Sequence, residues 1–533
     1  MSKRSIVFAI IFGLVLLVSL PFIGVSQENP KSGGEIVLGL SQTLPGLNPL
    51  QEGGSYARYA YRQIFDPLVM LHPENREPVP YLAKSWEYSE NGEEITFNLH
   101  SGVKFHNGAE LTSEDVEFSL KWMMNPENPT DRKADVEWIN DVKIIDKYTF
   151  KIVIKEEMAP YAPAIPTLAT TLISIVPKNF GGLSQEEFNR NPIGSGPFKL
   201  EKWVQEDRLI LSKNEDYWLK KPHLDKVIIR PIPELSTMML ELEKGGVDVT
   251  DRITNQQIEK FRKDKDVEVQ QENAENFFWF GFNMQRSPFN NLKFREAVYM
   301  SINMDSTHQA LKGNTSIRAY GIIPPTIFAN DREFIKNHFA YEENDEKAKK
   351  YFEELEQQGV IGSNFSFKVY APPDPVRIRF AEALVTNLKQ NNIRAEVQSL
   401  EWGSYLDLLY RSEDNPDGEY GMYIVGWPGF PDPYYLLQRL FHSKNTAPGS
   451  PNFSLYKNQA VDLLIEAGNN TVDRDLRESY YKAAQRLIMA DLPVIPAYHN
   501  LTTHGVRKRV HEKRVHTNYA LVTPYRNVWV ESK

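Results

Sequence analysis

The chain has 533 residues, a length that predicts two or more structural units rather than one compact core. Its formal net charge of −9 argues against a nucleic-acid-binding protein, which needs a basic face for the phosphates. It has no cysteine, which excludes disulfides, thiolate metal sites, a cysteine nucleophile and a lipid anchor on cysteine.

Residues 1–26 have the layout of a secretory signal peptide. Lys3 and Arg4 precede the apolar run 6–20, which Pro21 and the small-residue segment 24–26 follow. An uncleaved membrane anchor is the alternative, because residues 6–25 approach the ~20 residues that span a bilayer. We expect cleavage, since Pro21 interrupts the run, and a mature protein that is periplasmic or extracellular.

The first half of the mature chain favours strands. Alternation of polar and apolar residues, or a short apolar run, predicts strands at Glu35–Leu40, Glu94–Leu99 and Thr149–Ile154. A helix is predicted over Thr112–Met124, because Thr112 or Ser113 can cap it and acidic residues suit its first turn.

The second half predicts an α/β lobe. Within residues 365–399 a strand around Phe367 and Val369 is followed by a helix over Arg377–Gln390 and a second strand from Arg394. A strand, a helix and a strand in so short a span predict parallel strands joined by a right-handed crossover. Further helices are predicted at Asp345–Gln357, Trp402–Tyr410, Gln459–Asn469 and Arg474–Met489.

The sequence shows no recognisable catalytic motif. It has neither a Gly-x-Ser-x-Gly elbow nor a phosphate-binding Gly-x-x-x-x-Gly-Lys loop. His511 and His516 are five residues apart, which places them on different helix faces and fails the zinc-protease spacing. A secreted glycoside hydrolase stays open as an alternative, because its two carboxylates need only proximity in space. We expect no enzyme activity, no metal and no cofactor.

A series of sequence blocks is similar to extracellular solute-binding protein family 5, the class of dipeptide-, oligopeptide- and nickel-binding proteins. The blocks occur in family order over nearly the whole mature chain: 82–86, 96–99, 102–108, 112–116, 191–198, 245–249, 281–283, 288–289, 294–298, 426–427, 432–433 and 491–496. Glycine and proline dominate several blocks, so most of them are expected to build turns and packing rather than the ligand site.

The resemblance implies an α/β fold of two lobes in the large class II periplasmic-binding-protein type, with the ligand cleft between the lobes. Lobe one would comprise residues 35–69, 191–273 and 499–533, with an extra subdomain at 70–190, and lobe two residues 274–498. Crossing segments near 274–278 and 495–499 would act as the hinge. The implied partner is the permease of an ATP-driven importer at the membrane, served by a monomer that binds no nucleic acid.

The resemblance also directs attention to the segment after Gly426. Peptide-binding members often place an aspartate there for the ligand's ammonium group, but Phe430 occupies that place in this chain. Asp432 precedes Pro433, a pattern typical of a helix cap, so Asp432 is a candidate cap as well as a candidate ammonium ligand. Phe430 and Trp427 are further candidate contacts to the ligand.

Other candidate contacts are mostly aromatic, since flat apolar faces stack on sugar rings and peptide side chains alike. They are Trp402, Tyr405, Trp279, Asn283 and Tyr56. Ordinary core packing is the alternative for each aromatic ring. We expect a peptide ligand, with a β-linked oligosaccharide as the main alternative and a nickel chelate or another small solute behind it. A ligand sensor that docks on a chemoreceptor would share the fold.

Overall fold

The computed structural model describes residues 30–51, 56–72, 76–159, 161–171, 173–411, 415, 417–512 and 525–532. The expected signal peptide lies outside these residues. In the part of the chain that is described, no helix combines the length and apolar character needed to cross a bilayer.

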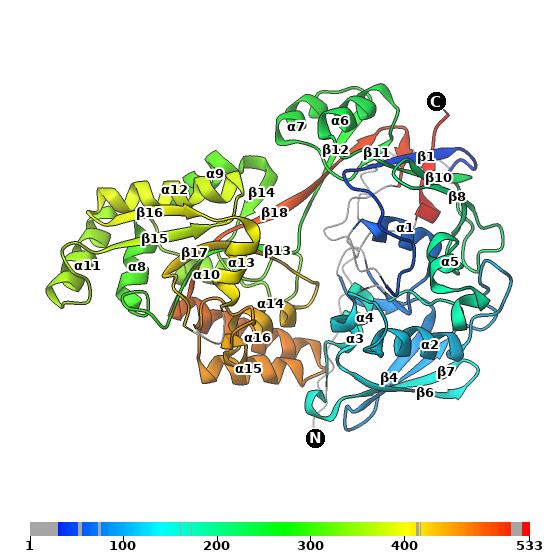
Figure 1. The fold of residues 1–533 in the computed structure, drawn as a ribbon, viewed down its shortest axis with the longest axis horizontal. Helices are drawn as coiled ribbons and strands as arrows, with labels where there is room; N and C mark the ends of the chain where they lie inside the picture. Colours follow the sequence, from blue (N-terminus) through cyan, green and yellow to red (C-terminus); the bar gives the residue numbers. More distant parts are fainter. Residues whose placement is uncertain are drawn as a thin grey trace, which may run out of the picture.

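The chain forms two lobes that share one mixed sheet of twelve strands (Figure 1). The strand order is β16-β15-β17-β13-β18-β11-β1-β10-β9-β8, and β12 and β14 also pair with β18. Strand β18 (Val494–Arg507) runs through both lobes. The two-lobe α/β fold expected from the sequence is confirmed.

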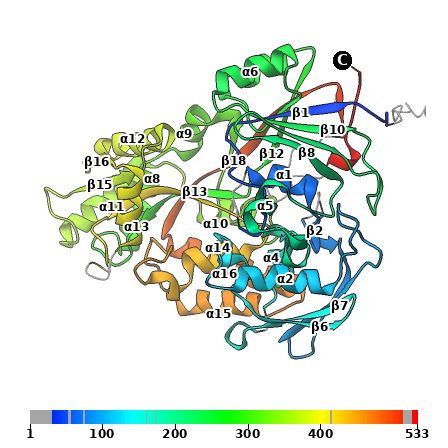
Figure 2. The ribbon, with the colours of Figure 1, turned by 45° about the vertical axis from the view of Figure 1, so that its right-hand side comes forward.

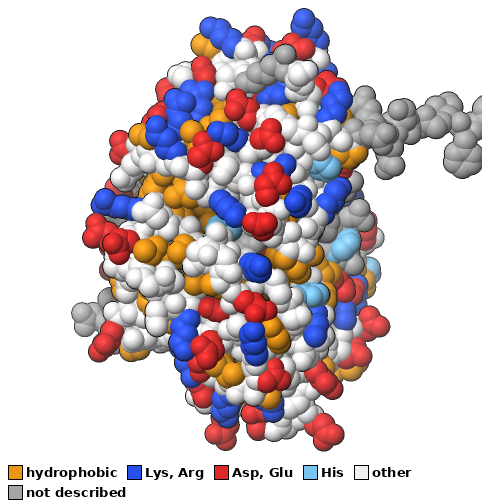
Figure 3. Space-filling view, turned by 90° about the vertical axis from the view of Figure 1, so that its right-hand side faces the viewer, with side chains coloured by type: hydrophobic (Ala, Val, Ile, Leu, Met, Phe, Trp, Pro, Cys, Tyr) orange, Lys and Arg blue, Asp and Glu red, His pale blue; other side chains and the backbone are white. Residues whose placement is uncertain are grey.

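Lobe one surrounds the predicted first strand, β1 (Glu35–Leu40), which pairs in parallel with β10 (Lys226–Pro231) and β11 (Val249–Thr250). Its other strands are β8 (Phe198–Val204), β9 (Arg208–Lys213) and β12 (Val267–Asn273). Its helices are α1 (Ala57–Ile64), α6 (Leu235–Lys244) and α7 (Asn255–Arg262), and α5 (Gln185–Arg190), at the end of the expected subdomain 70–190, precedes β8. The outer face of this half of the molecule carries acidic and basic side chains intermixed (Figure 3).

A second sheet forms the subdomain, in the order β4 (Ala83–Tyr88), β5 (Glu94–Leu99), β7 (Thr149–Ile154) and β6 (Ile139–Asp146). The predicted strands at β5 and β7 are confirmed. The predicted helix is α2 (Ser113–Met124), whose first turn carries a capping box between Thr112 and Asp115. Short elements complete it: β2 (Val69–Leu71), β3 (Pro78–Pro80), α3 (Lys133–Val136) and α4 (Ala164–Thr171). Its buried residues join many of those of lobe one in a large core, and a smaller separate cluster in lobe one includes buried residues of α6 and α7.

Lobe two has a core of its own, formed by buried residues between Phe277 and Tyr498. The predicted β-α-β unit is β15 (Ser366–Ala371), α12 (Pro375–Gln390) and β16 (Arg394–Ser399), with parallel strands. Strands β13 (Asn276–Phe282), β14 (Ser316–Arg318) and β17 (Met422–Pro428) complete its part of the sheet. Helices α8 (Leu292–Met300), α9 (Met304–Leu311), α10 (Arg332–Phe339), α11 (Asp345–Gln357), α13 (Trp402–Tyr410), α14 (Pro433–Phe441), α15 (Gln459–Asn469) and α16 (Arg474–Asp491) surround them (Figure 2).

Two chain segments connect the lobes. One is the short link from β12 to β13, and the other is the middle of β18. They are hydrogen-bonded to each other: Ala274 N donates to the Asn500 carbonyl at 2.8 Å, and Asn500 N donates to Asn276 Oδ1 at 2.9 Å. The link between the two cores is therefore a narrow pair of backbone segments.

Residues 191–197, one of the blocks shared with the family, form a turn packed against the end of α1. A Cβ on Gly194 would lie 1.9 Å from the Ile64 carbonyl oxygen, so only glycine fits there. His106 bonds the same turn: its Nε2 lies 3.0 Å from the Gly196 carbonyl, and its Nδ1 lies 3.4 Å from Gly194 N. This arrangement suits the neutral ring with the proton on Nε2. Burial lowers the pKa of His106 to about 4.

We predict that His106 makes stability pH-dependent. Its folded pKa is lowered, so the unfolded chain binds the proton more tightly and stability falls as the pH drops from about 6.5 towards 4. His106→Gln should reduce the loss of unfolding free energy between pH 7 and pH 4.5 by roughly 1–2 kcal/mol. Urea unfolding at both pH values measures this. An unchanged difference would contradict the assignment.

A buried ion pair fastens the segment after β18 to the start of lobe one. Arg509 Nε and Nη2 donate to the two carboxylate oxygens of Asp248 at 2.7 Å each. Asp248 Oδ2 also accepts the backbone N–H of Val37 in β1 at 2.9 Å. Only 1% of the Asp248 side chain is exposed, so the pair is shielded from solvent.

Asp248→Asn should therefore destabilise the protein by about 3 kcal/mol, because it leaves the Arg509 side chain, which is only 14% exposed, without its counter-charge. The matched control is Asp207→Asn, which removes the exposed pair with Arg208 and should cost less than about 1 kcal/mol. If the two substitutions lower the denaturation midpoint equally, the buried pair contributes no more to stability than the exposed pair.

Candidate functional site

The main candidate site begins at the edge of lobe two where its parallel strands end. Strands β15, β16 and β17 run in the same direction, and helices α12, α13 and α14 follow them. A carboxylate caps each helix: Asp374, Glu401 and Asp432 accept backbone N–H groups of the first turns. In open α/β sheets, ligands bind outside the carboxyl ends of the strands.

Three of the predicted contacts lie at this edge. Trp402 begins α13 and is 43% exposed. Trp427, at the end of β17, is half-buried, and its ring lies edge-on to Phe453 at 6.0 Å. Phe430 is half-buried and contacts Tyr435, with ring centroids 4.1 Å apart. Of the ligand contacts predicted from the sequence, these three aromatic residues lie at the strand ends of lobe two.

Asp432 is occupied within lobe two. Its Oδ1 accepts Tyr434 N at 2.9 Å, which confirms the predicted helix cap. Both of its oxygens accept Arg477 Nη2, at 3.0 and 2.8 Å, and the residue is 5% exposed. A ligand's ammonium group would have to displace a buried guanidinium from it. The alternative of an ammonium ligand is therefore corrected to a structural role.

Three other predicted contacts lie in the core of lobe two. The Tyr405 hydroxyl donates to the Ile424 carbonyl at 2.7 Å, and its side chain is fully buried. Trp279 is 2% exposed and stacks on Phe277. Asn283 is fully buried, and its Nδ2 donates to the carbonyls of Asp417 and Tyr420 at 2.7 and 3.0 Å. Their burial favours a packing role for these three side chains over direct contact with a ligand.

Lobe one presents a polar cluster where β1 and β11 end. Ser41 Oγ donates to Asp251 Oδ2 at 2.6 Å and lies 3.1 Å from the Tyr56 hydroxyl. Arg252 donates to the same hydroxyl, and its side chain is 46% exposed. Burial raises the pKa of Asp251, opposed by the bond from Ser41 and the charge of Arg252. Tyr56 was predicted; the other three were missed, because their proximity depends on the pairing of β1 with β11.

The lobes also meet away from the crossing segments, at the edge of the subdomain. The rings of Tyr161 and Tyr434 are 5.6 Å apart, and Ala162 N donates to the Asn469 carbonyl at 2.9 Å. A cavity of about 140 Å³ lies beside this contact and is lined by Phe430 and Arg439 from lobe two and by residues of α3 and α4. It has room for a side chain but not for a whole ligand of the usual size.

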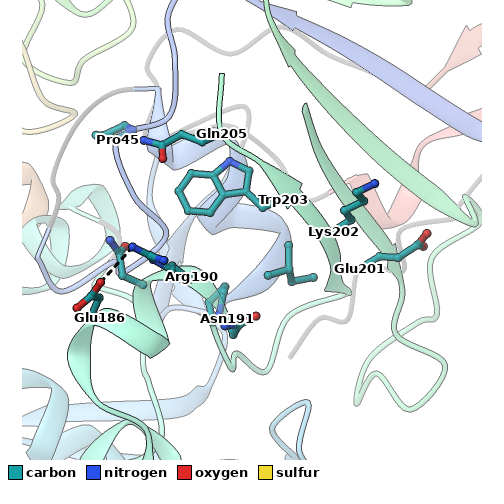
Figure 4. Close-up of a pocket in the computed structure, with 11 residues that line it drawn as sticks. Pro45, Glu186, Arg190, Asn191, Glu201, Lys202, Trp203 and Gln205 are labelled. Carbon is teal, nitrogen blue, oxygen red and sulfur yellow. Dashed lines mark hydrogen bonds and ion pairs between the residues drawn. The ribbon is translucent and has the colours of Figure 1, made fainter. Parts of the chain in front are cut away.

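A larger hollow of about 740 Å³ lies on lobe one between α5 and β8 (Figure 4). Its lining is polar, and Trp203 and the ion pair of Arg190 with Glu186 are prominent in it. Both members of that pair are more than two-thirds exposed, so the hollow is a surface feature. It contains none of the predicted contacts.

Among the described residues, no group of three or more histidine or acidic side chains is placed to hold a metal ion. Of the histidine pair that fails the zinc-protease spacing, His516 lies outside the described residues. What both lobe edges offer is aromatic surface, hydroxyl groups and guanidinium groups. These are suited to binding a solute by contact and hydrogen bonding.

Comparison with known proteins agrees with this arrangement. The family described as "Bacterial extracellular solute-binding proteins, family 5 Middle" matches residues 77–448. The "Dipeptide-binding protein" of Escherichia coli (strain K12) is 27% identical over 87% of this chain and 89% of its own length. The "Heme-binding protein A" of Haemophilus influenzae is 25% identical over 91% of this chain and 90% of its own.

A solved structure extends the likeness to three dimensions. The ABC transporter-associated periplasmic binding protein DppA from Helicobacter pylori, in complex with the peptide STSA, is 26% identical to this chain, with a TM-score of 0.73. The alignment covers 94% of this chain and 99% of that one. The resemblance inferred from the sequence blocks is thus confirmed over most of the chain. The protein belongs to the bacterial extracellular solute-binding proteins of family 5.

Proposed function

We propose that this protein is the substrate-binding subunit of an ABC importer and that it delivers a peptide to a membrane permease. The observation that supports the proposal is the pair of strand-end edges, one on each lobe, joined by the crossing segments at residues 274–275 and 499–500. Among the described residues, further contacts between the lobes include the subdomain contact and a hydrogen bond from Gln271 Nε2 to the Asn314 carbonyl. Such a pair of edges can close on a solute and release it unchanged. An exported location, with residues 1–26 removed as a signal peptide, is part of the proposal.

A peptide is the ligand class that the relatives favour. The Escherichia coli relative is named for dipeptides, and the Helicobacter pylori structure holds a peptide. The oligosaccharide alternative receives no support from these relatives. Heme is a second candidate suggested by one relative's name, but the described residues of the two edges present no histidine pair for it. The glycoside hydrolase alternative would require turnover of a sugar substrate.

The contact set that we propose is smaller than the set predicted from the sequence. Trp402, Trp427 and Phe430 would contact the ligand from lobe two, and Tyr56 with Arg252 from lobe one. The two cores and the crossing hydrogen bonds support the lobe boundaries that we propose, at 273/274 and 498/499. Closure about these segments would exclude water and strengthen the polar contacts to the ligand.

The first test is direct binding. Isothermal titration against di-, tri- and tetrapeptide pools should give dissociation constants in the micromolar range or tighter, and β-linked disaccharides should give no heat. Small-angle scattering should show a smaller radius of gyration when the binding peptide is added, because the lobes close. Binding only to sugars, or release of a hydrolysed product, would refute the proposal.

The second test concerns Trp402. Because its ring is exposed, Trp402→Ala should weaken peptide binding at least tenfold while the melting temperature changes by less than about 2 °C. Leu463→Ala, at a residue 59% exposed on α15, is the matched control and should change neither quantity. Unchanged affinity of the Trp402 variant would remove this ring from the site.

A further inference from the structure

The subdomain contacts lobe two at a place away from the crossing segments. Ala162 N donates to the Asn469 carbonyl at 2.9 Å, and the rings of Tyr161 and Tyr434 meet edge to face with centroids 5.6 Å apart. Helices α3 and α4 of the subdomain lie next to α14 and α16 on one side of the interval between the lobes, and β12 and β18 cross on the other side (Figure 1 and Figure 2). The lobes are therefore joined at two separate places.

Tyr434 is the centre of this second contact. It is a partly buried residue of α14 that packs against the large core of lobe one and the subdomain and also against the core of lobe two. Among the described residues, no other partly buried hydrophobic side chain packs against both of these cores. Tyr434 follows shortly after the helix cap Asp432 and the candidate ligand contact Phe430. Its position is therefore tied to the ligand edge of lobe two.

The contact combines shielded aromatic groups with an exposed rim. Burial raises the pKa of Tyr88 in β4 of the subdomain, the charge of Arg477 lowers it and the charge of Asp432 raises it further. Tyr88 therefore lies within electrostatic reach of the buried ion pair of lobe two. At the rim, Arg474 Nη1 lies 3.1 Å from Glu77 Oε1, and both side chains are more than one-third exposed. Solvent and salt screen such an exposed pair, so the aromatic groups provide most of the attraction.

The contact is not packed as closely as a core. The cavity of about 140 Å³ separates part of the two surfaces, with Phe430 and Arg439 on lobe two and Asp135 and Glu137 on the subdomain. Atoms that face a void lose dispersion contacts there, so these surfaces adhere less strongly than close-packed ones. The contact can therefore form and break while each core stays intact.

The place of the contact decides which state of the protein it stabilises. Helix α14 begins at the strand-end edge of lobe two, so Tyr434 lies on the same side of the crossing segments as the candidate ligand contacts. A rotation about the crossing segments that separates the two strand-end edges must also separate Tyr434 from Tyr161. The contact is therefore compatible with edges that are close together, and it is lost when they move apart.

We propose that the subdomain is a latch for lobe two: Tyr434 docks beside Tyr161 when the lobes close on the solute, and the solute leaves only after this contact breaks. The proposal rests on the proposed function and adds a role for the subdomain to it. Edge-to-face aromatic pairs are favourable beyond the apolar area that they bury, which suits them to this role. The backbone hydrogen bond from Ala162 to Asn469 fixes the register of the two surfaces.

The experiment locks the latch with a disulfide. The chain has no cysteine, so the double variant Ala162→Cys, Asn469→Cys contains a single possible pair. The backbone hydrogen bond between these two residues brings their Cα atoms within reach of a disulfide. A fluorescently labelled peptide that binds the wild-type protein is added, the variant is oxidised, and release is followed after a chase with unlabelled peptide. Release should be at least tenfold slower from the oxidised form than from the reduced form, and a reductant should restore it.

Two sets of controls accompany the double variant. Each single cysteine variant should release the peptide at one rate under oxidising and reducing conditions. Tyr161→Ala should release the peptide at least fivefold faster than the wild-type protein, because the ring partner of Tyr434 is gone. Tyr148→Ala is matched to it, since Tyr148 is a partly buried tyrosine of the same subdomain whose hydroxyl bonds Glu110, and it should keep the wild-type release rate.

The possible results separate the latch from the proposed function. Equal release from the oxidised and reduced double variant, with the disulfide verified by mass spectrometry, would overturn the latch and leave the peptide proposal intact. If the double variant does not fold or oxidise, the comparison of Tyr161→Ala with Tyr148→Ala decides, and equal release rates would overturn the latch. Absence of binding by every peptide to the wild-type protein would refute the proposed function and the latch with it.

Discussion

Strand β18 is the backbone element on which the two-lobe arrangement depends. Its first part pairs with β13 in lobe two, and its last seven residues pair in register with β12, from Leu501↔Asn273 to Arg507↔Val267, in lobe one. In both parts of β18, backbone N–H and C=O groups form hydrogen bonds with the neighbouring strand, so these groups have partners where the strand passes from one lobe to the other. Each lobe keeps a separate hydrophobic core. The two cores are therefore joined by paired backbone segments.

Close packing explains several glycines of the family blocks. At Gly194, Gly281 and Gly426 an added Cβ would lie 1.9, 2.1 and 2.0 Å from the Ile64 carbonyl, the Tyr423 ring and the Phe278 ring, respectively. At each position a backbone or an aromatic ring already occupies the space. The blocks are thus packing sites that bring strands and rings close together, and the ligand site depends on them indirectly.

The charged groups at the strand-end edge of lobe two differ in their partners. Asp432 is neutralised by Arg477 in a buried pair that also caps α14. Phe430, two residues before Asp432, contributes an uncharged aromatic ring. Glu401, which caps α13 at the same edge, is exposed. The edge therefore combines a neutralised carboxylate, an exposed carboxylate and aromatic rings.

The sequence by itself determined the secondary structure closely, because its signals are local. Periodicity and caps placed α11, α13 and α15 at the bounds that the structure has, and they placed the β-α-β unit with its helix beginning at Arg377 instead of Pro375. The helix-cap role of Asp432 followed from the proline after it. Tertiary structure decided which aromatic residues are exposed: Trp402 and Tyr405 lie three residues apart on one helix, yet one is 43% exposed and the other fully buried. It also decided the cluster of Tyr56, Ser41 and Asp251. Its members come from segments far apart in the chain, and only sheet pairing and helix packing bring them together.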